Sequence, residues 1–183
     1  YVPKDKDRLK EEREGISDEA IQNRAKQVYH LLHSWKKIPG TKPDFSINET
    51  ELIEWIKAAR VLAEKEGRLE VADMHIGQVL AQYPENIPEW PQEKLFKIIE
   101  DINTDSLKRN YSSAMFNKRG SSSRGPFDGG NIERGHAKYF GKLAEDYKNR
   151  FPNVSEIFKR LSDGYLLDAK RMDESAERDR LEY

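Results

Sequence analysis

Apolar side chains recur at steps of three and four residues along nearly the whole chain, and this spacing constrains the fold more than any other feature. An α-helix places side chains with this spacing on one face. No window shows the two-residue alternation between turn residues that is typical of strands. The pattern predicts an all-α fold, an irregular bundle of about seven helices, at about 17–37, 48–66, 69–82, 91–102, 104–115, 132–150 and 154–180.

The domain organisation follows from length and from a change in composition near the N-terminus. A chain of 183 residues suits one domain that buries its own core. Residues 4–14 carry five acids, five bases and one apolar residue, so we predict that 1–16 form a charged linker or a solvated helix. Residues 17–183 are predicted to form a single helical domain. Because the chain opens on Tyr1 rather than Met, we also expect it to continue from a longer protein.

The charge balance and the absence of cysteine narrow the classes of function. The chain has 32 basic and 33 acidic side chains, whereas a general nucleic-acid binder usually shows a large basic excess. Without cysteine it forms no disulfide and no zinc site with thiolate ligands. No apolar run approaches the ~20 residues that span a bilayer. We therefore expect a cytoplasmic protein with no membrane contact.

One long segment, 117–131, interrupts the helical spacing and contains four of the eleven glycines of the chain. A long polar loop inside a compact helical domain is either functional or disordered. Arginines can hold a phosphate or carboxylate through paired N–H groups, and the start of the next helix favours an anion. The segment and its flanks therefore predict an anion- or partner-binding site made of Lys118, Arg119, Ser121, Ser123, Arg124, Gly129, Gly130 and Arg134.

A second interpretation of this segment stays open. It is a flexible connection whose arginines point to water or to neighbouring acids of the same chain. The Gly-Lys-Ser/Thr signature of phosphate-binding loops is missing, and no dinucleotide fingerprint follows a strand.

No pattern in the sequence predicts a catalytic or metal site. His30 and His33 lie three residues apart, but no further ligand-type residue completes a metal site on their helix. Glu133 and His136 form a Glu-x-x-His pair, whereas di-iron bundles need two such pairs. Serine-nucleophile motifs are absent. An acid/base role for Glu133 and His136 would need both in a cleft with perturbed pKa values. We predict no catalytic residues, no metal and no cofactor.

The end of the last helix, 170–183, is very polar and keeps only Met172, Ala176 and Leu181 as apolar residues. Two interpretations are equally favoured. The helix extends past the body and packs on another subunit or domain, which would allow a homo-oligomer, or its end frays.

Several segments together resemble a helical region at the C-terminal end of large uncharacterised bacterial proteins. They are Leu31-Leu32-His33-Ser34-Trp35 with Pro39-Gly40, then Ile76-Gly77-Gln78-Val79-Leu80-Ala81, then Arg119-Gly120 with Ser123-Arg124-Gly125, and Gly129-Gly130 with Glu133-Arg134. The resemblance covers about 25–175. It implies that the chain is one module of a longer protein and that the 117–131 loop and the next helix form one pattern. It implies no activity.

These observations lead to two functional hypotheses. The first is a non-enzymatic helical interaction module of a larger intracellular bacterial protein, which contacts a partner protein or an upstream domain through the 117–131 loop. The alternative is a module that binds phosphate groups, most plausibly of nucleic acid, through the basic loop and helix start at 117–138. Phosphate binding would make the affinity depend on salt.

Overall fold

The computed structural model describes residues 15–85, 90–120, 125 and 128–182. These residues contain helices and no named strand, so the predicted all-α fold is confirmed. The described helices are α2 (Asp18–Ser34), α3 (Glu49–Lys65), α4 (Leu69–Leu80), α5 (Glu93–Ile102), α6 (Asp105–Lys118), α7 (Asn131–Tyr147) and α8 (Pro152–Glu182).

Side-chain caps begin three of these helices where the sequence predicts them. Ser17 accepts the Ala20 N–H at 3.2 Å, Asn48 accepts that of Glu51 at 3.4 Å, and Thr104 accepts that of Leu107 at 3.4 Å. Each side chain satisfies an N–H group that has no partner inside its helix. The starts of α2, α3 and α6 therefore follow directly from local sequence.

Several boundaries differ by a few residues from the prediction, and two of these differences have a visible cause. Helix α2 ends at Ser34 rather than near Lys37, because Trp35 takes an extended backbone (φ −72°, ψ 105°), and its ring lies 5.8 Å from that of Trp55 in α3 at a tilt of 46°. Helix α5 begins at Glu93 rather than Pro91, because Gln92 is extended and serves as its N-cap.

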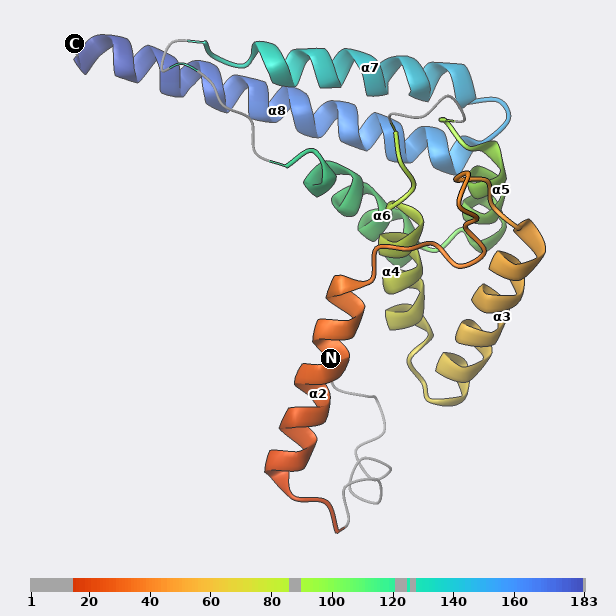
Figure 1. Ribbon diagram of the computed structural model, residues 1–183. Coiled ribbons are helices and arrows are strands. Elements are labelled where there is room, and N and C mark those ends of the chain that lie inside the picture. The colour runs from red at the N-terminus through yellow and green to blue at the C-terminus, as the bar shows by residue number, and fades with distance from the viewer. Residues whose placement is uncertain (1–14, 86–89, 121–124, 126–127, 183) are drawn as a thin grey trace.

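The long helices α7 and α8 lie antiparallel along one side of the molecule, and α6 packs against α8 beneath them (Figure 1). Helix α4 packs closely on α6, α3 packs on α4, and α5 joins α6 and α8. Phe96 of α5 is fully buried at this junction. Its ring meets the rings of Tyr147, Phe151 and Phe158 edge-on, with centroids 5.1 to 5.8 Å apart. These edge-to-face contacts favour one orientation of α5 against the α7–α8 pair.

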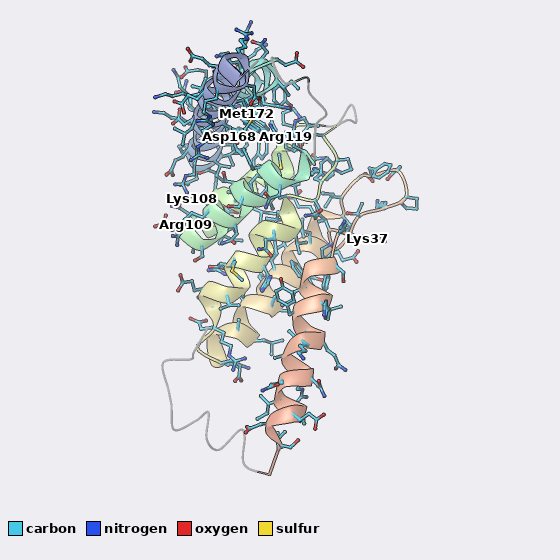
Figure 2. The ribbon with its side chains drawn as sticks, turned by 90° about the vertical axis from the view of Figure 1, so that its left-hand side faces the viewer. Lys37, Lys108, Arg109, Arg119, Asp168 and Met172 are labelled. Carbon is cyan, nitrogen blue, oxygen red and sulfur yellow. The ribbon has the colours of Figure 1, made fainter. Side chains whose placement is uncertain are left out.

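Helix α2 is the exception in this packing. No closely packed helix pair of the described chain includes it. Its N-terminal half extends beyond the turn between α3 and α4 in both views (Figures 1 and 2). Two apolar side chains of this helix are accordingly open to solvent, Val28 at 49% and Leu31 at 59% exposed, whereas Leu32 is half-buried and Trp35 packs on the core.

The closest approach between α4 and α6 depends on a glycine. A Cβ atom at Gly77 would lie 2.5 Å from the carbonyl oxygen of Leu107 and 3.1 Å from the amide nitrogen of Tyr111. We therefore expect Gly77→Ala to lower the free energy of unfolding by about 1–3 kcal/mol, although alanine favours helices more than glycine does. Urea unfolding followed by circular dichroism measures the change.

Gly164→Ala on α8 is the matched control, because a Cβ atom there meets nothing within 4 Å. This substitution is expected to stabilise the fold by about 0.5–1 kcal/mol through helix propensity alone. Equal effects of the two substitutions would contradict the close contact between α4 and α6.

Candidate functional site

The predicted site lies where the end of α6 approaches the start of α7. Lys118 is the last residue of α6 and Arg119 its C-cap, while Gly130 is the N-cap of α7. Arg119 lies at the end of α6 that faces the α7–α8 pair (Figure 2). Ser121, Ser123 and Arg124 fall outside the described residues.

Arg119 bonds to a buried carboxylate of its own chain. Its guanidinium lies 3.0 Å from Glu133 Oε1, and the side chain of Glu133 is only 1% exposed. The same guanidinium sits 5.6 Å from the ring centroid of Phe116 and 5.4 Å from that of Tyr165. Aromatic faces attract a cation at this range. Arg119 thus holds α6, α7 and α8 together through one charged group.

His136 belongs to the same cluster. Its ring stacks on Tyr165 with centroids 4.9 Å apart, and Phe116 lies 4.8 Å from Tyr165. Burial raises the pKa of Tyr165, and the nearby Arg119 partly opposes that rise. Glu133 and His136, the Glu-x-x-His pair of the sequence, therefore both take part in packing between helices.

Lys118 is turned toward the segment after α4. Its ammonium donates hydrogen bonds to the carbonyl oxygens of Ala81, at 3.1 Å, and of Tyr83, and lies 3.4 Å from Glu85 Oε1. Burial lowers the pKa of Lys118, whereas the negative charge of Glu85 raises it. The lysine closes the end of α4, where carbonyl groups lack partners inside the helix.

The start of α7 holds an anion that comes from α8. The N–H of Gly130 donates to Asp173 Oδ1 at 2.9 Å, and Arg134 forms an ion pair with Asp173 Oδ2. The Gly130 N–H and, to a lesser extent, Arg134 lower the pKa of the Asp173 carboxyl group. A helix N-terminus favours an anion, and here the Asp173 carboxylate of the same chain occupies the position that a bound anion would take.

The close approach of the start of α7 to α8 requires glycine. A Cβ atom at Gly130 would lie 2.3 Å from the carbonyl oxygen of Ala169, so the backbone of α7 can reach α8 only without a side chain there. Gly129, with φ +59°, takes a left-handed conformation that side chains rarely adopt. The two predicted site glycines thus both serve the contact between the start of α7 and α8.

Each described cation of the predicted site therefore bonds to groups of the same chain. Lys118, Arg119 and Arg134 have Glu85, Glu133 and Asp173 as ionic partners. The role of these residues in binding an anion or a partner stays a prediction. The sequence reasoning missed Asp173 as the carboxylate at the start of α7, because 43 residues separate it from Gly130.

The polar end of the last helix continues as helix α8 to Glu182. Ala176 is only 7% exposed, so this end packs at least partly on the chain itself. A contact with another subunit through α8 stays a prediction.

A cleft and a buried ion pair are further features of the described residues. A cleft of about 610 Å³ between α3 and α5 is lined by Ile53, Ile56, Ile98 and Ile102, with Arg60 at its side. Arg60 pairs with the buried Asp73 at 2.9 Å. Within the described residues no group of three or more metal-ligating side chains comes together, and none of the helices there is long and apolar enough to cross a bilayer.

Comparisons of the chain with models of known protein families, with curated proteins and with solved structures find no significant match. The resemblance to a C-terminal region of large bacterial proteins therefore stays a prediction.

The two arginines of the site are expected to differ strongly in their effect on stability. Arg119→Ala removes the Arg119 guanidinium from the buried carboxylate of Glu133 and should lower the free energy of unfolding by about 1.5–3 kcal/mol. Arg134→Ala breaks a pair whose side chains are 49% and 43% exposed, so the loss should stay below about 1 kcal/mol. Chemical denaturation of both variants checks the difference.

The double variant Arg119→Ala/Glu133→Gln serves as the control, because it removes the buried charge together with its partner. It should recover part of the stability lost in Arg119→Ala. Equal, small losses for both single arginine variants would show that Arg119 is not structural and would leave it available for a ligand.

Proposed function

We propose that this chain is a non-enzymatic helical module that binds another protein, and that α2 is its main contact surface. One observation carries the proposal. Part of the apolar stripe of α2 (Ile21, Ala25, Val28 and Leu32) is open to solvent, with Val28 49% exposed beside Leu31 at 59%, and α2 packs extensively on no other described helix.

Physical chemistry explains why such a helix is suited to a partner. A helix of 17 residues is only marginally stable in water unless its apolar face is packed. Fully burying one valine or leucine side chain contributes about 1.5–3 kcal/mol. A partner that covers the stripe would therefore stabilise α2 and gain affinity from the same contact.

The 117–131 loop, the contact surface expected from the sequence, has less support. The described cations at its ends are engaged by carboxylates of the same chain, and Arg119 in particular is only 21% exposed. The same geometry weakens the nucleic-acid alternative, because phosphate contacts need accessible lysines and arginines.

The non-enzymatic part of the proposal is supported by the positions of Glu133 and His136. Glu133 is 1% exposed and bonded to Arg119, and His136 is stacked on Tyr165. Neither arrangement places an acid and a base together at a surface that admits a substrate.

Site-specific photocrosslinking tests the proposal. The photoreactive residue p-benzoylphenylalanine replaces Val28 on α2 or, as control, Leu167 on α8, which is 55% exposed. Produced in its native host, the protein should form a discrete crosslinked species from position 28 and none from position 167. Mass spectrometry then identifies the crosslinked peptide.

A crosslink from position 28 to one defined peptide supports the proposal, whether that peptide belongs to this chain's own protein or to another. The absence of any such species, or the same diffuse pattern from both positions, would contradict it.

A further inference from the structure

We propose that the partner of α2 is α2 of a second copy of this chain, packed antiparallel to it about a two-fold axis. This inference rests on the proposed function and specifies its partner. Three properties of α2 carry it: the spacing of its apolar stripe, the charges at its two ends, and its position as an arm that extends from the body (Figure 1).

The stripe has a spacing that is complementary to itself. Its members within the helix, Ile21, Ala25, Val28 and Leu32, follow one another at steps of four, three and four residues, whereas Trp35, the next residue in the pattern, lies beyond the helix end near Trp55. This alternation is that of the apolar seam of a coiled coil. Because the order of steps is the same in both directions, an antiparallel copy places Ile21 opposite Leu32 and Ala25 opposite Val28. A two-fold axis requires such self-complementarity.

The ends of the helix carry opposite charges. The first turn contains Asp18 and Glu19, and Lys36 and Lys37 follow the last turn (Lys37 in Figure 2). All four residues are exposed. In an antiparallel pair the acidic end of each copy meets the basic end of the other. A parallel pair would instead bring like charges together at both ends, which disfavours association.

The structure leaves room for the second helix. Leu32 is half-buried at the rim of a pocket of about 390 Å³, which is also lined by Gln78 and Lys118. Ile21 of the second copy, opposite Leu32, would reach this rim. The N-terminal half of α2 extends beyond the α3–α4 turn, so the two bodies lie at opposite ends of the helix pair (Figures 1 and 2).

The contact between the two helices is small. A helix of 17 residues is about 25 Å long. Two such helices bury less than the ~1,200 Å² of standard stable interfaces. We therefore expect a monomer–dimer equilibrium that depends on concentration rather than an obligate dimer.

Analytical ultracentrifugation over a range from micromolar to about millimolar concentration measures this equilibrium. The wild-type chain should shift from monomer to dimer as concentration rises. Val28→Asp should raise the dissociation constant by at least roughly tenfold, because it places a carboxylate in the apolar seam. Leu167→Asp, at a similarly exposed leucine of α8, should leave the equilibrium unchanged. A monomer at every concentration, or a dimer that Val28→Asp does not weaken, would overturn the inference.

Disulfide trapping tests the direction of the pair, and the absence of native cysteine makes it unambiguous. A mixture of Ile21→Cys and Leu32→Cys chains should form a disulfide between the two kinds of chain under mild oxidation. Neither variant alone should crosslink, because equal positions lie about 16 Å apart along an antiparallel pair at 1.5 Å per residue.

Crosslinking of either single variant as efficiently as the mixture would indicate a parallel pair and overturn the antiparallel arrangement. The outcome also separates this inference from the proposed function. A chain that stays monomeric here, yet crosslinks from position 28 to a different protein, keeps the proposed function and removes the second copy as its partner.

Discussion

The ion pair between Arg119 and Glu133 is the interaction on which the arrangement of the C-terminal half depends. A carboxylate that is 1% exposed is costly to bury unless a cation and hydrogen bonds compensate it. Arg119 supplies that compensation from the end of α6 and covers the ring of Tyr165 in α8 at the same time. One guanidinium thus contacts side chains of all three helices, and a shift of α6 would remove Arg119 from both Glu133 and Tyr165.

At the start of α7, too, a charged side chain is bound by groups of the same chain. Asp173 of α8 accepts the Gly130 N–H and pairs with Arg134, so the anion-binding property of a helix N-terminus serves the contact between α7 and α8. Lys118 likewise closes the end of α4. The flanks of the 117–131 segment thus carry charges that complement their own surroundings, and strongly exposed apolar side chains lie elsewhere, on α2, α3 and α8.

Local signals predicted the helices well, because caps and apolar periods act within a few residues. Ser17, Asn48 and Thr104 mark helix starts whatever the rest of the chain does. The ion-pair partners could not be predicted in this way, since Arg134 and Asp173 lie 39 residues apart and meet only once α7 packs on α8. The period of α2 likewise predicted which residues share a face, but not that the fold leaves Val28 open, because periodicity does not indicate what covers a face.

We propose that α2 is the surface that binds and that the ends of α6 and α7 are structural parts. Hydrogen–deuterium exchange of the whole chain, compared at low and high protein concentration, tests that division directly. In dilute solution the amides of 18–34 should exchange quickly, since a helix of 17 residues without a packed face is marginal. At high concentration they should become protected, while amides of 105–119 and 131–147 keep the same slow exchange. Protection that changes at the ends of α6 and α7 and not in α2 would contradict the account.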